Sequence, residues 1–235
     1  MDDDLFMPNK IALMMDAFFA NPDLSIVTSY RELIDADGKK LSDLSATCPI
    51  AEEITKFSGE MIGTEILVNL MNFVGEPTTA LLKKSFLLNG HDLGFSGKEG
   101  KYLTSDFPTW LRLLSQGNMM YFPQPLSKFR WHEGNEQLHP KSRIRGIICW
   151  ALTIRTAIES NAYLCDLSTR RKAIVGWMNM ANAFLYAATT VSELWDDAEF
   201  HDLLCVFAGM SDALRNNCRI AFDIDTTLVL HMDEG

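Results

Sequence analysis

The sequence predicts a mixed α/β domain followed by an all-α domain. Up to about residue 138, short β-rich runs alternate with helical patterns, as they do in α/β layer folds. Past Pro140 only long segments with helical periodicity follow. We therefore expect an α/β domain over residues 1–138, with a mixed sheet and flanking helices, and a helical C-terminal domain over 139–235.

Turn residues and apolar periodicity define the elements of the first part. Pro8 suits a first helical turn, and the apolar residues after it recur at helical spacing until Asn21-Pro22. Strands are expected over 24–30 and 32–34, with a turn at 35–39. The remaining expected elements are a helix over 59–72, a strand over 78–82, a helix over 107–116 and strands over 119–122 and 126–131.

The last third of the chain predicts three helices. Each segment carries helical periodicity and begins with serine, a favoured N-cap residue: 142–163, 168–191 and 192–218. Residues 223–230 are expected to form a short strand or an extended tail. This pattern indicates a helical bundle or a two-helix repeat.

Composition excludes several classes of function. The 235 residues are 47% apolar and 22% charged, as in an ordinary globular protein, and the formal net charge is −10. That charge, without a basic cluster, argues against binding to nucleic acid or to an anionic membrane. Five widely spaced cysteines form no zinc or redox motif and suggest a reducing cytoplasm, and no stretch reaches the ~18 apolar residues of a membrane span.

The chain opens on three adjacent carboxylates, Asp2-Asp3-Asp4. Oxygen ligands of this kind are those that Mg²⁺ and Mn²⁺ prefer. An acidic start is also compatible with a solvated tail. The residues alone leave both interpretations open.

Another candidate carboxylate, Asp106, directly precedes the helix expected over 107–116. The helix dipole stabilises an anion at this position and keeps it ready to accept a proton. Aspartate is equally favoured there as an N-cap, and one side chain can serve both roles.

Three further segments follow the acidic start in a fixed order. Together with it they resemble the second half of the family 2 glycosyltransferases, which have the GT-A fold, from the metal-binding acidic motif onward. The segments are Phe73-Val74-Gly75-Glu76-Pro77-Thr78, Ser105-Asp106-Phe107-Pro108-Thr109-Trp110-Leu111-Arg112 and Pro125-Leu126-Ser127-Lys128-Phe129-Arg130-Trp131-His132. The resemblance covers residues 2 to about 138 and implies a partial GT-A-like sheet.

The resemblance also implies a site for sugar transfer from a nucleotide-sugar donor to a saccharide or another hydroxyl acceptor. Asp3 would occupy the ligand position for Mg²⁺ or Mn²⁺, with Asp2 and Asp4 beside it. His132 would complete the coordination of the metal or of the diphosphate. Asp106 would be the general base that deprotonates the acceptor, and the reaction would invert the anomeric carbon.

Two residues would contact the donor or the acceptor. Glu76 would touch the transferred sugar, although Pro77 also marks it as a turn residue. Arg130 would pair with phosphate oxygens, as arginine does in many phosphate sites.

The nucleotide-binding half of the family is absent from this sequence, which begins at the metal motif. A sheet without its first strands would expose an apolar edge. We therefore expect a homodimer or a partner chain to cover that edge, or the truncated chain to be inactive alone. The alternative is a non-catalytic assembly protein, in which the helical domain docks a partner and the remnant sheet is a scaffold.

Overall fold

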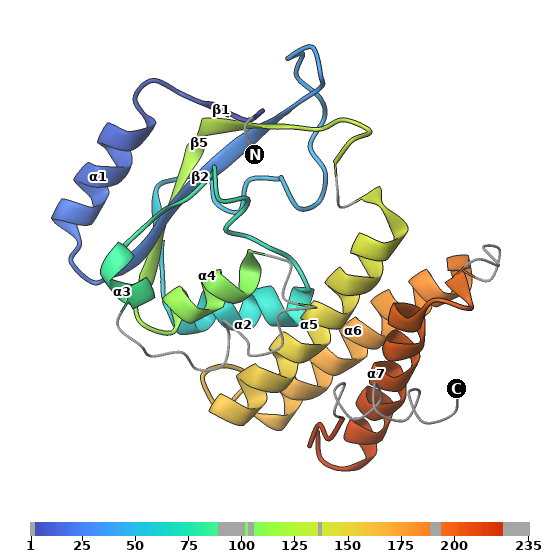
Figure 1. Cartoon of the computed structure of the whole chain (residues 1–235). Helices are drawn as coiled ribbons and strands as arrows, with labels where there is room; N and C mark the ends of the chain where they lie inside the picture. The colour runs from blue at the N-terminus through green and yellow to red at the C-terminus, as the bar shows by residue number, and fades with distance from the viewer. Residues whose placement is uncertain (1–2, 89–101, 103–105, 136–137, 189–193, 223–235) are drawn as a thin grey trace. The chain divides into compact units, whose positions relative to one another are not determined.

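The computed structural model describes residues 3–88, 102, 106–135, 138–188 and 194–222 (Figure 1). These residues form two compact units. The first contains the sheet and the helices around it, from residues up to 66, from 71 to 88 and from 106 to 135. The second contains residues 67–70, residue 102 and the helices from residue 138 onward. The predicted fold class is confirmed at the level of a mixed α/β part followed by helices.

The first unit is built on a five-stranded mixed sheet, curled like half of a barrel, with strand order β1-β5-β2-β4. Strands β2 and β5 run parallel, whereas β1 and β3 pair antiparallel with β5, and β4 pairs antiparallel with β2. The strands are β1 Leu5–Phe6, β2 Leu24–Ile34, β3 Thr55–Phe57, β4 Leu81–Leu82 and β5 Asn118–Arg130.

In the described part of the first unit, four helices surround this sheet, with α1 on one side and α2 and α4 on the other (Figure 1). Met14 of α1 packs with Val27 of β2 and Phe122 of β5 in a buried apolar cluster. The helices are α1 Lys10–Ala20, α2 Gly59–Asn69, α3 Lys84–Leu88 and α4 Phe107–Leu114. The helices predicted after Pro8, over 59–72 and over 107–116 are therefore confirmed, with somewhat shorter bounds.

The second unit packs three long helices against one another: α5 Pro140–Ser160, α6 Leu167–Ala188 and α7 Ala198–Arg215. Trp177 of α6 is fully buried, and its indole N–H donates to the carbonyl of Ile147 at 2.7 Å. Among the described residues, no helix is both long and apolar enough to cross a membrane.

Two pairs of predicted strands are each one continuous strand. Residues 24–30 and 32–34 form β2, in which nearly every residue is buried, including Arg31 at 5% exposure. Residues 119–122 and 126–131 join in β5, because Pro123 and Pro125 lie in an irregularity of the β2–β5 register between Phe122 and Ser127. Proline is tolerated at such a bulge, since no ladder N–H is needed there.

The ends of several predicted elements differ in the structure. The strand predicted over 78–82 is reduced to β4, because Thr79 N–H closes a turn onto the Glu76 carbonyl. The serine caps expected for the first two helices are replaced by other residues, and His139 precedes α5. Ser192, the cap expected for the third helix, lies outside the described residues, and Asp197 caps α7 by accepting from the Glu199 N–H. Before α6, Asp166 accepts from backbone N–H groups of the first turn. The segment 223–230 lies outside the described residues.

Gly59 allows α2 to begin in close contact with the end of α4. A Cβ at this position would lie 2.0 Å from the Leu114 carbonyl oxygen and 2.1 Å from that of Gly117. We expect Gly59→Ala to lower the free energy of unfolding by about 3 kcal/mol, the upper part of the range for overpacking. Chemical denaturation measures this change.

Gly146→Ala is the matched control, because Gly146 lies within α5 and a Cβ there meets no atom within 4 Å. That variant should gain roughly 0.5–1 kcal/mol from helix propensity. Equal effects of the two substitutions would contradict the close contact at Gly59.

Candidate functional site

The candidate site lies where the parallel strands β2 and β5 end. The backbone N–H of Arg130, the last residue of β5, donates to Asp4 Oδ1 at 3.0 Å, which holds the acidic N-terminal segment beside this strand end. In open α/β sheets, ligands bind outside the carboxyl ends of the strands. The fold therefore puts two of the predicted acidic residues, Asp3 and Asp4, at an edge suited to a ligand. Asp2 lies outside the described residues.

Asp3 and His132 form a pair at this edge. His132 Nε2 lies 2.9 Å from Asp3 Oδ2, although the two residues are 129 positions apart in the sequence. The hydrogen bond from His132 lowers the pKa of the Asp3 carboxyl. Both side chains remain partly exposed, at 40% for Asp3 and 34% for His132.

This pair fits a divalent cation only when a substrate supplies further ligands. A carboxylate and an imidazole are acceptable ligands for Mn²⁺, and Mg²⁺ commonly takes one or two carboxylates with phosphate oxygens. Within the described ranges, no group of three His, Cys, Asp or Glu side chains is arranged to hold a metal.

Asp4 is held by the protein through both of its carboxylate oxygens, and its predicted role as a metal ligand stays a prediction. One oxygen accepts the Arg130 N–H, and the other accepts the Thr78 hydroxyl at 2.5 Å. Both oxygens are thus occupied by the protein. Asp4 fixes the N-terminal segment to the loop of residues 75–79.

Lys10 is a site residue that the sequence motifs did not single out. It is 1% exposed, its amine donates to the Thr78 carbonyl, and the amine lies 4.3 Å from the centre of the Phe6 ring. Burial lowers the pKa of Lys10 to about 8, and the nearby Asp4 carboxylate opposes this shift. The sequence offered one sign that Lys10 is buried: it lies four positions before the apolar Met14, and positions i and i+4 share one helix face.

Glu76 forms the centre of a second charged group. Its Oε2 lies 2.5 Å from Nε of the buried Arg31 and accepts the Thr79 hydroxyl at 3.4 Å. Burial and, next, the Glu76 carboxylate raise the pKa of Asp106. The ionised form of Asp106 is thus disfavoured mainly by its own burial.

Asp106 is the residue before α4, but its carboxylate makes no capping hydrogen bond. Its backbone carbonyl accepts from the N–H groups of Thr109 and Trp110 instead. The indole N–H of Trp110 donates to the Gly75 carbonyl at 3.0 Å, which fixes α4 to the 75–79 loop. The side chain of Asp106 is thus not used as a cap, although it stands at the cap position.

The 75–79 loop connects the two acidic groups. Thr78 of this loop donates to Asp4. Glu76 of the same loop pairs with Arg31, and its carboxylate raises the pKa of Asp106. Gly75 adopts a φ of +96°, a left-handed conformation that favours glycine, and its N–H donates to the side chain of Asn72. The sequence placed Glu76 in a turn but gave no sign of these long-range contacts.

Arg130 binds backbone oxygens. Its guanidinium donates to the carbonyls of Asp3, Asp35 and Ala36 at 2.7 to 2.9 Å. These bonds hold the acidic segment and the 35–39 turn together at the end of β5. The predicted contact of Arg130 with phosphate stays a prediction.

No family model and no curated protein matches this sequence.

Proposed function

We propose that this chain is a metal-dependent, GT-A-like glycosyltransferase that moves a sugar from a nucleotide-sugar donor to a hydroxyl acceptor. The observation that carries the proposal is the connection of two carboxylate groups by one loop. Thr78 of this loop binds Asp4, the neighbour of Asp3, which pairs with His132. Gly75 of the same loop accepts from the indole of Trp110, whose backbone N–H donates to the Asp106 carbonyl. Sugar transfer needs two such groups for two different tasks.

In the proposed reaction, the acceptor oxygen forms a bond to the anomeric carbon of the donor. The bond from that carbon to the diphosphate oxygen breaks, and its electron pair leaves with the diphosphate. Asp106 accepts the acceptor's proton, for which its raised pKa is favourable. A single displacement of this kind inverts the anomeric carbon.

Asp3 and His132 would hold Mg²⁺ or Mn²⁺ together with diphosphate oxygens. When bound, the cation would neutralise the charge of the leaving diphosphate. Glu76 would keep Asp106 basic through charge repulsion, and its own Oε2 faces Arg31. Asp4, Lys10 and Arg130 would position the 75–79 loop and the acidic segment.

Isothermal titration of the full chain tests the donor-binding step. We expect nucleoside diphosphates to bind in the presence of Mn²⁺ and to lose at least about tenfold in affinity when Mn²⁺ is removed. Asp3→Asn should cause a similar loss. Asp212→Asn, which neutralises an exposed carboxylate on α7, should leave the affinity unchanged.

Failure of every nucleoside diphosphate to bind with Mn²⁺ present would reject the proposal. That result would favour the non-catalytic assembly role as the second candidate. Exposed aromatic side chains in the helical unit are the observation in favour of that role, since Tyr186 is 80% and Trp195 46% exposed.

A further inference from the structure

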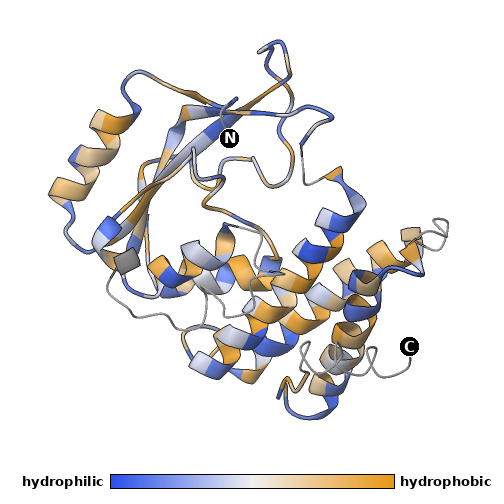
Figure 2. Cartoon of the chain, in the orientation of Figure 1, coloured by the Kyte–Doolittle hydropathy of each residue, from blue (hydrophilic) through white to orange (hydrophobic). Residues whose placement is uncertain are grey.

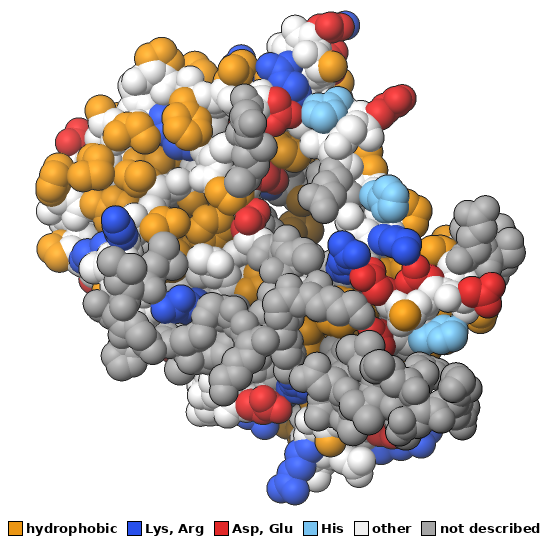
Figure 3. Space-filling view, viewed as in Figure 1, with side chains coloured by type: hydrophobic (Ala, Val, Ile, Leu, Met, Phe, Trp, Pro, Cys, Tyr) orange, Lys and Arg blue, Asp and Glu red, His pale blue; other side chains and the backbone are white. Residues whose placement is uncertain are grey.

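Helix α1 is apolar on its outward face as well as on its buried face. Lys10 and Met14 point inward and are buried, whereas the row Ile11, Met15 and Phe19 is 47%, 37% and 75% exposed. A surface helix normally presents polar side chains to water. Figure 2 shows α1 coloured mostly as hydrophobic, and Figure 3 shows hydrophobic side chains gathered over this side of the first unit.

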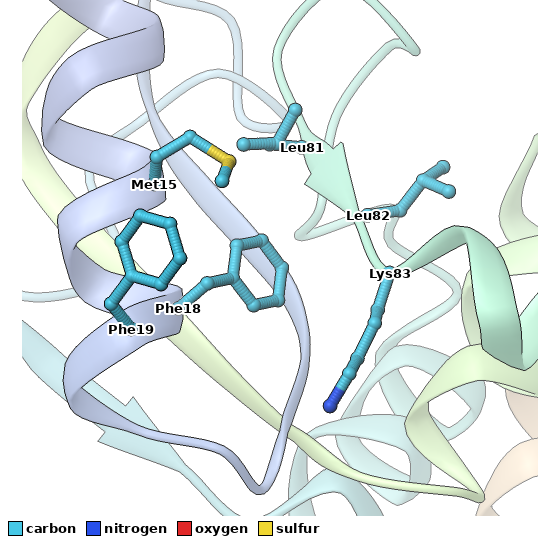
Figure 4. Close-up of a pocket in the computed structure, with 6 residues that line it drawn as sticks. All are labelled: Met15, Phe18, Phe19, Leu81, Leu82 and Lys83. Carbon is cyan, nitrogen blue, oxygen red and sulfur yellow. The ribbon is translucent and has the colours of Figure 1, made fainter.

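A groove of about 310 Å³ runs between α1 and β4. Its lining is apolar except for one lysine and consists of Met15, Phe18, Phe19, Leu81, Leu82 and Lys83 (Figure 4). The groove belongs wholly to the first unit. It is large enough to accept an aromatic side chain.

The strand beside the groove has an open edge. β4 pairs with β2 through Leu81 and Leu82, and the Lys83 N–H donates to the Ser25 carbonyl of the same neighbour. Because backbone groups alternate in direction along a strand, the N–H and C=O of Leu82 point to the other side. No described strand pairs there.

We propose that this face binds a second copy of the chain. Antiparallel pairing of the two β4 strands about a two-fold axis at Leu82 would let each Leu82 donate to and accept from its counterpart. Such a contact is self-complementary, as a closed dimer requires. Phe19 of each copy would then enter the groove of the other.

Charge complementarity selects a second copy rather than another occupant. Asp16 is the one acidic residue of α1, is exposed, and lies on the outward face with Phe19. Lys83 lines the groove on the same patch, and its amine donates to the Pro22 carbonyl in an exposed hydrogen bond of 3.0 Å, which a partner carboxylate would have to share or replace. A two-fold axis would bring each Asp16 toward the partner's Lys83, so one patch supplies both charges of both pairs. This inference does not depend on the proposed sugar transfer.

Sedimentation equilibrium of the full chain tests the dimer. We expect a concentration-dependent dimer whose Kd rises at least about 30-fold in Phe19→Asp, because a central aromatic contact is lost and a charge is buried. Phe19 is largely exposed, so the variant should fold, which circular dichroism checks. Val175→Asp alters another exposed apolar residue, on α6, and should leave the Kd unchanged.

A charge exchange tests the orientation of the two copies. Asp16→Lys and Lys83→Glu should each raise the Kd about tenfold. An equimolar mixture of the two variants should dimerise nearly as well as the original chain, because each copy then meets an opposite charge at both positions. A chain that stays monomeric at all concentrations, or a dimer indifferent to Phe19→Asp, overturns the proposal. Capture by vesicles or by a peptide with no dimer present overturns it as well.

Discussion

Asp106→Asn is expected to lower the rate of the proposed sugar transfer by a factor of about 10²–10⁴, the usual contribution of a general base. The substitution keeps the size of the side chain but removes its ability to accept a proton. Donor binding should be retained, because the proposed donor contacts are made by Asp3 and His132 and do not use the Asp106 carboxylate. The measurements are kcat and the Mn²⁺-dependent Kd for a nucleoside diphosphate.

The stability of the same variant shows whether it folds. Burial and Glu76 raise the pKa of Asp106 in the folded state, so the ionised form costs stability once the pH exceeds the ordinary carboxyl pKa. Asp106→Asn should therefore be more stable than the original chain at neutral pH. The gain should disappear at acidic pH, where the carboxyl is protonated in both folded and unfolded states.

Glu76→Gln separates the roles of the two carboxylates. Removing the negative charge of Glu76 should lower the pKa of Asp106 and shift the acidic limb of the pH–rate profile to lower pH. Full turnover by Asp106→Asn, or an acidic limb that does not move in Glu76→Gln, would contradict the assignment of the base.

Lys10 should make the protein more stable as the pH rises from about 8 to 10.5. Its pKa is about 8 in the folded state and 10.5 in the unfolded chain, so between these values the unfolded chain binds more protons. Stability then increases with pH. The difference between the two pKa values corresponds to at most about 3 kcal/mol across this interval.

The comparison is the free energy of unfolding against pH for the original chain and for Lys10→Met. The difference between the two curves should change by that amount between pH 8 and 10.5. Lys172→Met removes an exposed lysine of α6 and controls for the loss of one positive charge. Parallel curves for the original chain and Lys10→Met would show that the Lys10 amine is not dehydrated in the folded protein.

Local patterns predicted the helices of this protein better than its strands. Helix α1 follows from Pro8 and from apolar residues at helical spacing, both of which are local signals. Strand β2 was divided because polar residues such as Arg31 interrupt its apolar run. The polar groups of these side chains bind partners far along the chain: the Thr28 hydroxyl donates to the Val74 carbonyl, and Arg31 pairs with Glu76.

The candidate site shows the same limit. The sequence singled out Asp3, His132 and Asp106 through short motifs. It could not show that Asp4 is occupied by the protein, because its partners are Thr78 and the backbone of Arg130, far along the chain. The role of Lys10 was hidden for the same reason, since a buried lysine is recognised only by what surrounds it.

The loop of residues 75–79 has one further consequence. Its Thr78 is bound to Asp4, and its Glu76 contributes to the proton affinity of Asp106. A ligand that competes with Thr78 for Asp4 would release one of the anchors of the loop that carries Glu76. Occupancy at the acidic segment would then tune the basicity of a carboxylate that the ligand never touches.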